Sequence, residues 1–93
     1  MKYFDWNELK NARLKAEREV GFEDVLTALD EGRLLDDIPH PNQKHKRQRL
    51  LIVAINDYAF VIPYVEDDEK IFLKTIYASR KFTNKYLSKG EQG

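Results

Sequence analysis

The sequence contains no cysteine, only four glycines and three prolines among 93 residues, and no long apolar run. The absence of cysteine excludes disulfides and thiolate chemistry. Scarce glycine and proline, with 34% charged residues, indicate one globular domain over residues 1–93 with a single modest core. The longest apolar run, residues 50–55, is far shorter than the roughly 18 residues of a membrane span. The N-terminus has no signal-peptide core, so we expect a cytoplasmic protein with no membrane partner.

The sequence also lacks the common cofactor motifs. It has no GxxxxGK[ST] or GxGxxG phosphate loop, no HExxH pair, and no cysteine or histidine cluster at metal-ligand spacing. We therefore expect neither a metal ion nor a nucleotide cofactor.

The net charge is zero, but the charges are divided along the chain. Residues 1–37 hold ten acids and six bases, residues 38–56 four bases and no acid, residues 57–69 five acids, and residues 70–89 six bases. If the fold brings the two basic segments together, they form a patch able to hold a polyanion. The alternative is that these charges are ordinary solvated surface.

The first third of the chain predicts a strand and two helices. Residues 3–4 open a strand, and Asp5 with Glu8 forms a capping box for a helix beginning at about Trp6. Its inward face is predicted to be a narrow apolar stripe. The stripe consists of Leu9, Ala12, Ala16 and Val20. After a break at Gly21, apolar residues at helical spacing predict a second helix from residue 22 to a cap at Gly32.

The remainder predicts a sheet and a short C-terminal helix. Residues 34–38, 50–55, 58–65 and 71–77 read as strands, with a hairpin turn at 56–57. The polar loop at 40–49 has two prolines at its start, Pro39 before it and Pro41 within it, and no helix is expected there. Ser79 is the predicted N-cap of a helix that ends at about residue 87. The fold class is α+β: a mostly antiparallel sheet of four to five strands, two N-terminal helices on one face, and a short C-terminal helix.

Neither face of the strand at residues 58–65 is plainly polar. Tyr58, Phe60, Ile62 and Tyr64 share one face, and small or branched residues share the other. Two helices can cover one face only. We expect the aromatic face to be left for a partner protein or for stacking bases, or to be covered in part by the C-terminal helix.

Two cations stand at the start of the C-terminal helix. Arg80 and Lys81 occupy positions where the helix dipole disfavours positive charge by about 0.3–1 kcal/mol each. One explanation is an anion such as a phosphate docked beside them. The other is that both side chains turn away to solvent or to carboxylates.

RNA cleavage without a metal would need a base, an acid and cations for the dianionic transition state. Arg80, Arg49 and Lys74 are candidates for the charged role, and His40 is the candidate base because neighbouring cations favour its neutral form. Asp36 or Asp37 is the alternative base, although adjacent strand residues face opposite ways and only one could serve. The candidate RNA-binding residues are Lys44, Lys46, Arg47, Lys81 and Lys85, with Tyr77 and Tyr86 to stack or donate. The spacing alone does not force these assignments.

Three segments resemble the BrnT toxins of bacterial type II toxin–antitoxin systems, which belong to the RelE-like superfamily. They are residues 4–11 (FDWNELKN), residues 21–25 (GFEDV), and residues 76–80 (IYASR) followed by Tyr86. The resemblance spans nearly the whole chain and implies a RelE-like fold, metal-independent endoribonuclease activity, and neutralisation by a small antitoxin. It also implies that operator DNA is bound only through the antitoxin. Arg80 matches the arginine of the family's Ser-Ala-Arg motif.

The sequence departs from that family at two places. Where the family often has an acid in its last helix, this chain has Thr83, Asn84 and Lys85. Where the family usually has Lys-His-Gly before its second helix, this chain has the residues at 18–21. These departures bear on catalysis more than on fold. Two hypotheses therefore stand: a ribonuclease toxin, or a non-catalytic module that binds nucleic acid or protein.

Overall fold

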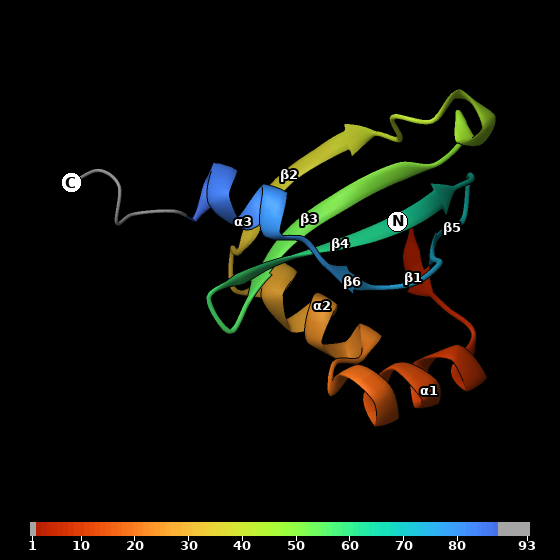
Figure 1. Ribbon diagram of the computed structural model, residues 1–93. Helices are drawn as coiled ribbons and strands as arrows, with labels where there is room; N and C mark the ends of the chain where they lie inside the picture. Colours follow the sequence, from red (N-terminus) through yellow and green to blue (C-terminus); the bar gives the residue numbers. More distant parts are fainter. Residues whose placement is uncertain (1, 88–93) are drawn as a thin grey trace.

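The computed structural model describes residues 2–87, in which two helices follow the first strand and a third helix follows the last strand (Figure 1). In chain order they are β1 (Tyr3–Asp5), α1 (Glu8–Arg18), α2 (Phe22–Asp30), β2 (Leu34–Pro39), a 3-10 helix (Gln43–His45), β3 (Arg49–Ile55), β4 (Tyr58–Glu66), β5 (Lys70–Leu73), β6 (Tyr77–Ala78) and α3 (Arg80–Tyr86). The predicted α+β class is confirmed, with two N-terminal helices and a short C-terminal one.

The sheet has the order β1-β5-β4-β3-β2, and β6 pairs with β4 beyond the end of β5. Only the pair of β1 with β5 is parallel. The predicted hairpin of β3 and β4 is present, and both Asn56 and Asp57 adopt positive φ, at 53° and 62°. The single strand predicted at residues 71–77 is divided instead. Between β5 and β6, the backbone N–H of Lys74 donates to the carbonyl of Pro63 at 2.8 Å, and regular pairing resumes only at Tyr77.

Helix α1 begins two residues later than predicted. The capping box of Asp5 with Glu8 does not form; Asn7 is the N-cap, and its side-chain oxygen accepts a hydrogen bond from the Lys10 N–H at 2.9 Å. Asp and Asn cap helices about equally well, so the sequence offers two starting points. The parallel pairing of β1 with β5 continues through Asp5, and this keeps Asp5 in the strand.

Of the inward stripe predicted for α1, only Val20 is buried, and it lies after the end of the helix at Arg18. Leu9 is 81% exposed, and Ala12 and Ala16 are also exposed, whereas the buried residues of the helix are Asn11 and Leu14. The helix is therefore rotated so that its smallest apolar residues face solvent.

The reason for this rotation is the hydrogen bonding of Asn11. Its side-chain oxygen accepts from the N–H of Phe22 at 2.8 Å, and its amide donates to both carboxylate oxygens of Glu23 at 3.0 Å. The N–H of Phe22 stands in the first turn of α2, where backbone N–H groups have no acceptor within their own helix. A buried and satisfied asparagine therefore joins the two helices.

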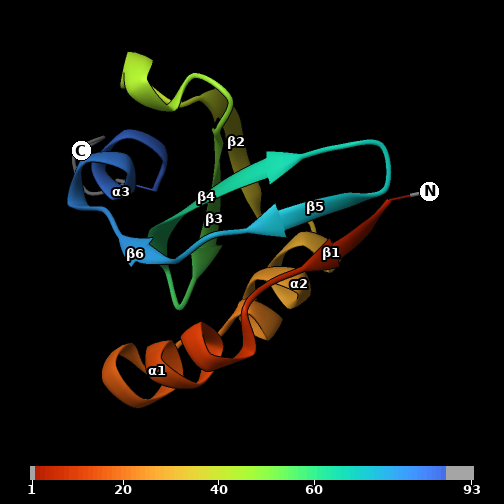
Figure 2. The same cartoon turned by 90° about the vertical axis from the view of Figure 1, so that its right-hand side faces the viewer.

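The sheet lies between two unequal layers, α1 with α2 on one side and α3 on the other (Figure 2). The larger cluster lies under α1 and α2 and consists of Leu14, Val20, Phe22, Val25, Ala28, Leu51, Val53, Ile55, Ile62, Tyr64, Leu73 and Ile76. The smaller cluster consists of Leu50, Ile52, Ala59 and Val61, packed against side chains of β2 and α3.

The expectation for the aromatic face was wrong as stated. Ile62 and Tyr64 belong to the larger cluster and Phe60 packs against it, so α1 and α2 cover this face. Helix α3 covers part of the opposite face, through Phe82 and Tyr86. Both faces are apolar, and the alternation alone could not show which one takes the two helices.

The polar loop also differs from expectation. It contains one turn of 3-10 helix, capped by Asn42, whose side chain accepts from the Lys44 N–H at 2.9 Å. The prolines precede this turn and so do not prevent it. No helix among residues 2–87 has the length and apolar character needed to cross a bilayer.

Candidate nucleic-acid interface

Part of the sheet on the α3 side is left uncovered by the described residues, and we call it the open face. It comprises Tyr3, Val65, Lys70, Phe72, Lys74 and Tyr77. In β5 and β4, Ile71, Leu73 and Tyr64 point to the larger cluster, so the alternate residues point to the α3 side. Tyr77 lies opposite Val61 of the smaller cluster and shares its side of the sheet.

The open face combines aromatic rings with cations. The side chains of Tyr3 and Tyr77 are 55% and 40% exposed, and those of Val65 and Phe72 are half-buried. The ammonium groups of Lys70 and Lys74 lie 5.8 and 5.9 Å from the centroid of the Phe72 ring. Exposed rings beside cations are the usual elements of a surface that binds single-stranded nucleic acid.

Helix α3 begins where β6 ends, so its first residues border the open face. Ser79 is the N-cap as predicted, and its hydroxyl accepts from the Phe82 N–H at 3.1 Å. Arg80 and Lys81 are exposed in the first turn, and neither side chain makes an ion pair within residues 2–87. The Lys81 ammonium lies 5.6 Å from the Phe82 ring.

Thr83 fixes this helix to β4. The backbone N–H of the buried Ala59 donates to the Thr83 hydroxyl at 2.8 Å, and that hydroxyl donates to the Ser79 carbonyl at 2.7 Å. The Ser79 N–H in turn donates to the Ala59 carbonyl at 2.9 Å. Thr83 therefore fixes the start of α3, where Arg80 stands. It lies in the segment where the family that the sequence resembles often has an acid.

We predicted that Tyr86 would stack on RNA or donate to it, but its ring and its hydroxyl both contact other residues of the chain. Its ring packs half-buried on Phe82 with centroids 6.0 Å apart, and its hydroxyl donates to Asp36. That hydrogen bond, with the nearby charge of Lys85, holds the pKa of Asp36 below its usual value. Tyr86 thus anchors the end of α3 to β2 and does not offer a free ring face.

The candidate base His40 lies in the polar loop, separate from α3. Its Nδ1 accepts a hydrogen bond from the Asn42 N–H at 3.0 Å, and its ring centroid lies 4.8 Å from that of His45. With Nδ1 occupied, the neutral ring carries its proton on Nε2. In this arrangement the Nε2–H of His40 can donate a hydrogen bond, and the Nδ1 lone pair that a base would use is taken by the Asn42 N–H.

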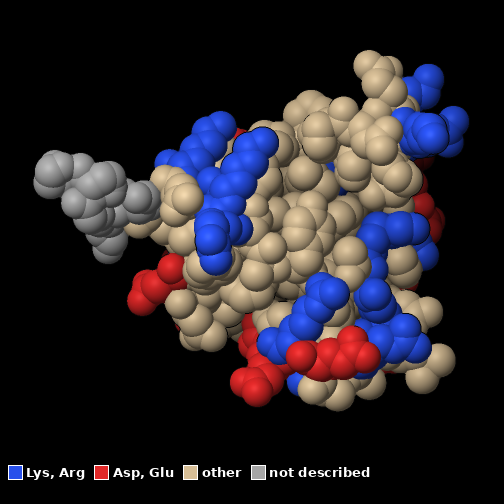
Figure 3. Space-filling view, viewed as in Figure 1, with Lys and Arg blue, Asp and Glu red and all other residues tan. Residues whose placement is uncertain are grey.

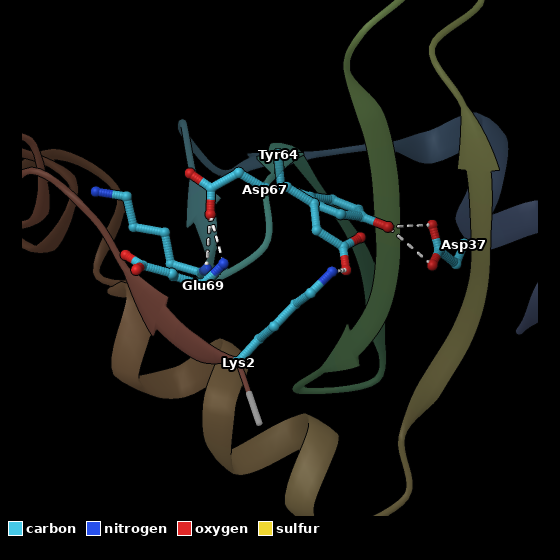
Figure 4. A network of polar contacts seen from close by, with 7 residues as sticks. Lys2, Asp37, Tyr64, Asp67 and Glu69 are labelled. Atoms are coloured by element: carbon cyan, nitrogen blue, oxygen red, sulfur yellow. Dashed lines mark hydrogen bonds and ion pairs between the residues drawn. The ribbon is translucent and has the colours of Figure 1, made fainter.

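Arg49 lies on the opposite side of the sheet from Arg80. It follows the alternation of the larger cluster, and its guanidinium binds Asp37 through a carboxylate oxygen at 3.0 Å and the backbone carbonyl at 2.9 Å. The hydroxyl of Tyr64 reaches across β3 and donates to both Asp37 oxygens at 2.8 and 2.9 Å (Figure 4). The structure therefore does not bring Arg49 into one site with Arg80.

Asp36 and Asp37 point to opposite faces, as predicted for neighbours on a strand. Asp36 holds Tyr86 on the α3 side, and Asp37 holds Tyr64 and Arg49 on the other. Both carboxylates are occupied, so neither is a free base in this arrangement.

The loop cations are exposed at the far end of the sheet from α3. Lys44 and Lys46 make no side-chain ion pair within residues 2–87. Arg47 lines a pocket of about 400 Å³ with Lys2 and Arg49. The acids Glu66, Asp67 and Asp68 line the same pocket. These acids would oppose a phosphate near Arg47.

The two basic segments flank the sheet and do not merge into one patch. Figure 3 shows lysine and arginine atoms over α3, over the loop, and along the lower right, around a stretch of other residues. Five cations of residues 2–87 are paired with acids: Lys2, Lys15, Arg33, Arg49 and Lys70. Of the cations that we predicted to contact RNA or the reacting groups, only Arg49 is among these pairs.

Sequence reasoning missed Phe72 and the role of Thr83. Phe72 had been assigned only to a buried strand, although the spacing of Lys70, Phe72 and Lys74 places a ring between two cations on one face. Thr83 gave no sequence signal, because its partner Ala59 lies 24 residues away.

Comparisons with models of protein families, with curated proteins and with solved structures gave no match for this chain.

Proposed function

We propose that this chain binds single-stranded RNA across the open face and cleaves it as the metal-independent endoribonuclease toxin of a type II toxin–antitoxin pair. One observation carries the binding part: Lys74, which has no acid partner within residues 2–87, lies beside the half-buried Phe72 ring on a face that also carries the exposed rings of Tyr3 and Tyr77. The BrnT-like segments of the sequence support the toxin part. Together these make an RNA backbone the ligand that best fits the surface.

In this proposal Arg80 stabilises the negative charge that develops on the phosphate during cleavage. It stands exposed in the first turn of α3, two residues after β6, and its guanidinium makes no ion pair within residues 2–87. Lys74 supplies a second positive charge on the same face. Preorganised cations of this kind act without any metal ion.

The proposal includes a cognate antitoxin in the cytoplasm. An antitoxin segment with acidic side chains would cover Arg80, Lys81 and the open face, and so exclude RNA by occupying the same charges. Contact with operator DNA would then come only through the antitoxin.

A non-catalytic binding module is the second candidate, and a specific observation favours it. The pocket that Lys74 lines holds neither Arg80 nor His40, and Arg49 lies across the sheet. A surface that binds RNA without an assembled acid and base would not cleave it.

The test compares the wild-type chain with Arg80→Ala in an RNA-cleavage assay containing EDTA and in a growth assay after induction. We expect Arg80→Ala to stay within about 0.5 kcal/mol of wild-type stability, because an exposed cation at a helix start adds little, and to lose cleavage and toxicity. Thermal melting checks the fold, and Lys15→Ala, a cation of α1 paired with Glu23, is the matched control. Full activity in Arg80→Ala would remove Arg80 from the site, and RNA binding without cleavage by the wild type would favour the binding module.

A further inference from the structure

A second group of cations lies at the edge of the sheet beside the open face. Asn7, Leu9, Lys10, Arg13 and Lys74 line a pocket of about 460 Å³ between the first turns of α1 and the link from β5 to β6. Three of these five residues are cations, and none is an acid. This pocket differs in charge from the pocket near Arg47, which is lined by three acids as well as by cations.

None of the three cations has a carboxylate partner within residues 2–87. Lys10, Arg13 and Lys74 form no ion pair there, whereas Lys15, further along the same helix, binds Glu23 at 3.1 Å. Three like charges around one pocket repel each other, and an anion in the pocket would remove that repulsion. Lys10 is only half-exposed, so its charge is less screened than that of a fully solvated lysine.

Lys74 connects this pocket to the open face. Its ammonium lies 5.9 Å from the Phe72 centroid, on the face that carries the exposed aromatic rings, while the same side chain lines the pocket. A nucleic-acid strand whose bases stack on Phe72 or Tyr77 would therefore carry its backbone past Lys74 toward α1.

We infer that Lys10, Arg13 and Lys74 form a subsite for a backbone phosphate of an RNA strand that crosses the open face. This inference rests on the proposed RNA binding. An acidic protein segment is the competing occupant; continuity with the aromatic rings, on which bases stack, favours RNA. The subsite extends the basic surface onto α1, within residues 1–37, where acids outnumber bases and no residue was predicted to contact RNA.

The test measures the affinity of the full chain for a labelled single-stranded RNA at a series of salt concentrations. The variants are Lys10→Gln and Arg13→Gln, and Lys15→Gln removes one charge from the same helix outside the pocket. Each lost phosphate contact should reduce the slope of log affinity against log salt by about 0.7. Between 50 and 200 mM salt, the wild type should then lose about 2.6-fold more affinity than either pocket variant. Lys15→Gln should keep the wild-type slope, and thermal melting of each variant checks its fold.

The outcomes separate this inference from the proposal on which it rests. A wild-type slope near zero would overturn both. If the wild-type slope is steep and all three variants keep the wild-type slope, the subsite is overturned and the proposed RNA binding is not. Unchanged RNA slopes together with weaker binding of a polyglutamate peptide by the pocket variants would overturn it in favour of an acidic protein partner.

Discussion

At the scale of single residues, the two acids of β2 bind partners other than the cations that we assign to the RNA surface. Asp37 binds Arg49 and Tyr64, and Asp36 binds Tyr86, so these three pairs stabilise the fold, while Arg80 and Lys74 make no ion pair within residues 2–87. The sequence predicted that the two acids would point to opposite faces. It could not predict their partners, because Arg49 lies 12 residues from Asp37 and Tyr64 lies 27 residues away.

Tyr64 gives a test of this network through its pKa. Burial, followed by the hydrogen bond to Asp37, raises the pKa of Tyr64 from 10.0 to about 12. Because the folded-state pKa is above the unfolded one, the stabilisation is complete below pH 10 and is lost as pH rises toward 12.

We therefore expect Tyr64→Phe to lower the free energy of unfolding by about 1.5 kcal/mol at pH 8. This is the lower end for a hydrogen bond to a charged group, since Asp37 is partly exposed. The difference from wild type should shrink between pH 10 and pH 12. Urea unfolding at several pH values measures it, with Tyr3→Phe, an exposed tyrosine, as control. A difference that stays constant over this range would show that the Tyr64 hydroxyl is not held as the structure has it.

At the scale of elements, local signals predicted the parts that local contacts determine. The β3–β4 hairpin follows from two residues that tolerate positive φ, and α3 starts at its predicted N-cap Ser79. Helix α1 was misplaced because Asp5 and Asn7 are equivalent caps, and pairing of β1 with β5 decides between them. Its inward face then depended on Asn11, whose partners Phe22 and Glu23 belong to another helix.

The attachment of α3 to β4 can be tested at Thr83. Thr83→Val keeps the shape of the side chain but leaves the buried N–H of Ala59 without its acceptor, which costs about 1–3 kcal/mol. We expect the free energy of unfolding to fall by that amount and the Ala59 amide to exchange its hydrogen faster. Asn84→Ala, an exposed change on the same helix, should stay within about 0.5 kcal/mol of wild type. Equal stability of the two variants would mean that α3 does not depend on this hydroxyl.

At the scale of the whole molecule, the layers explain both the success and the failure of the sequence reading. The α+β class follows from the order of helical and strand periodicities. The assignment of faces failed because both faces of β4 are apolar, and only packing shows that α1 and α2 take the aromatic one. The open face is consequently formed by β1, β5, β6 and the end of β4, with α3 at its border.

The charge distribution also becomes clear only at this scale. The cations of the polar loop and those of α3 lie at opposite ends of the sheet in a neutral chain, and Lys74 of the open face with the cations of the α1 edge adds positive charge elsewhere on the surface (Figure 3). A polyanion that runs from the first turn of α3 past Lys74 to the α1 edge would meet cations on that path, whereas Glu66, Asp67 and Asp68 would oppose it near Arg47.

The most direct test of the central claim is to map the RNA-binding surface by NMR. A single-stranded RNA with methylated 2′-hydroxyls, which resists cleavage through that group, is added to the ¹⁵N-labelled full chain. The account predicts that amide shifts gather in β5, β6 and the first turn of α3, and that α2 and the Asp37 region of β2 stay unchanged. Shifts confined to the α2 side of the sheet, or none at a concentration well above that of the protein, would contradict it.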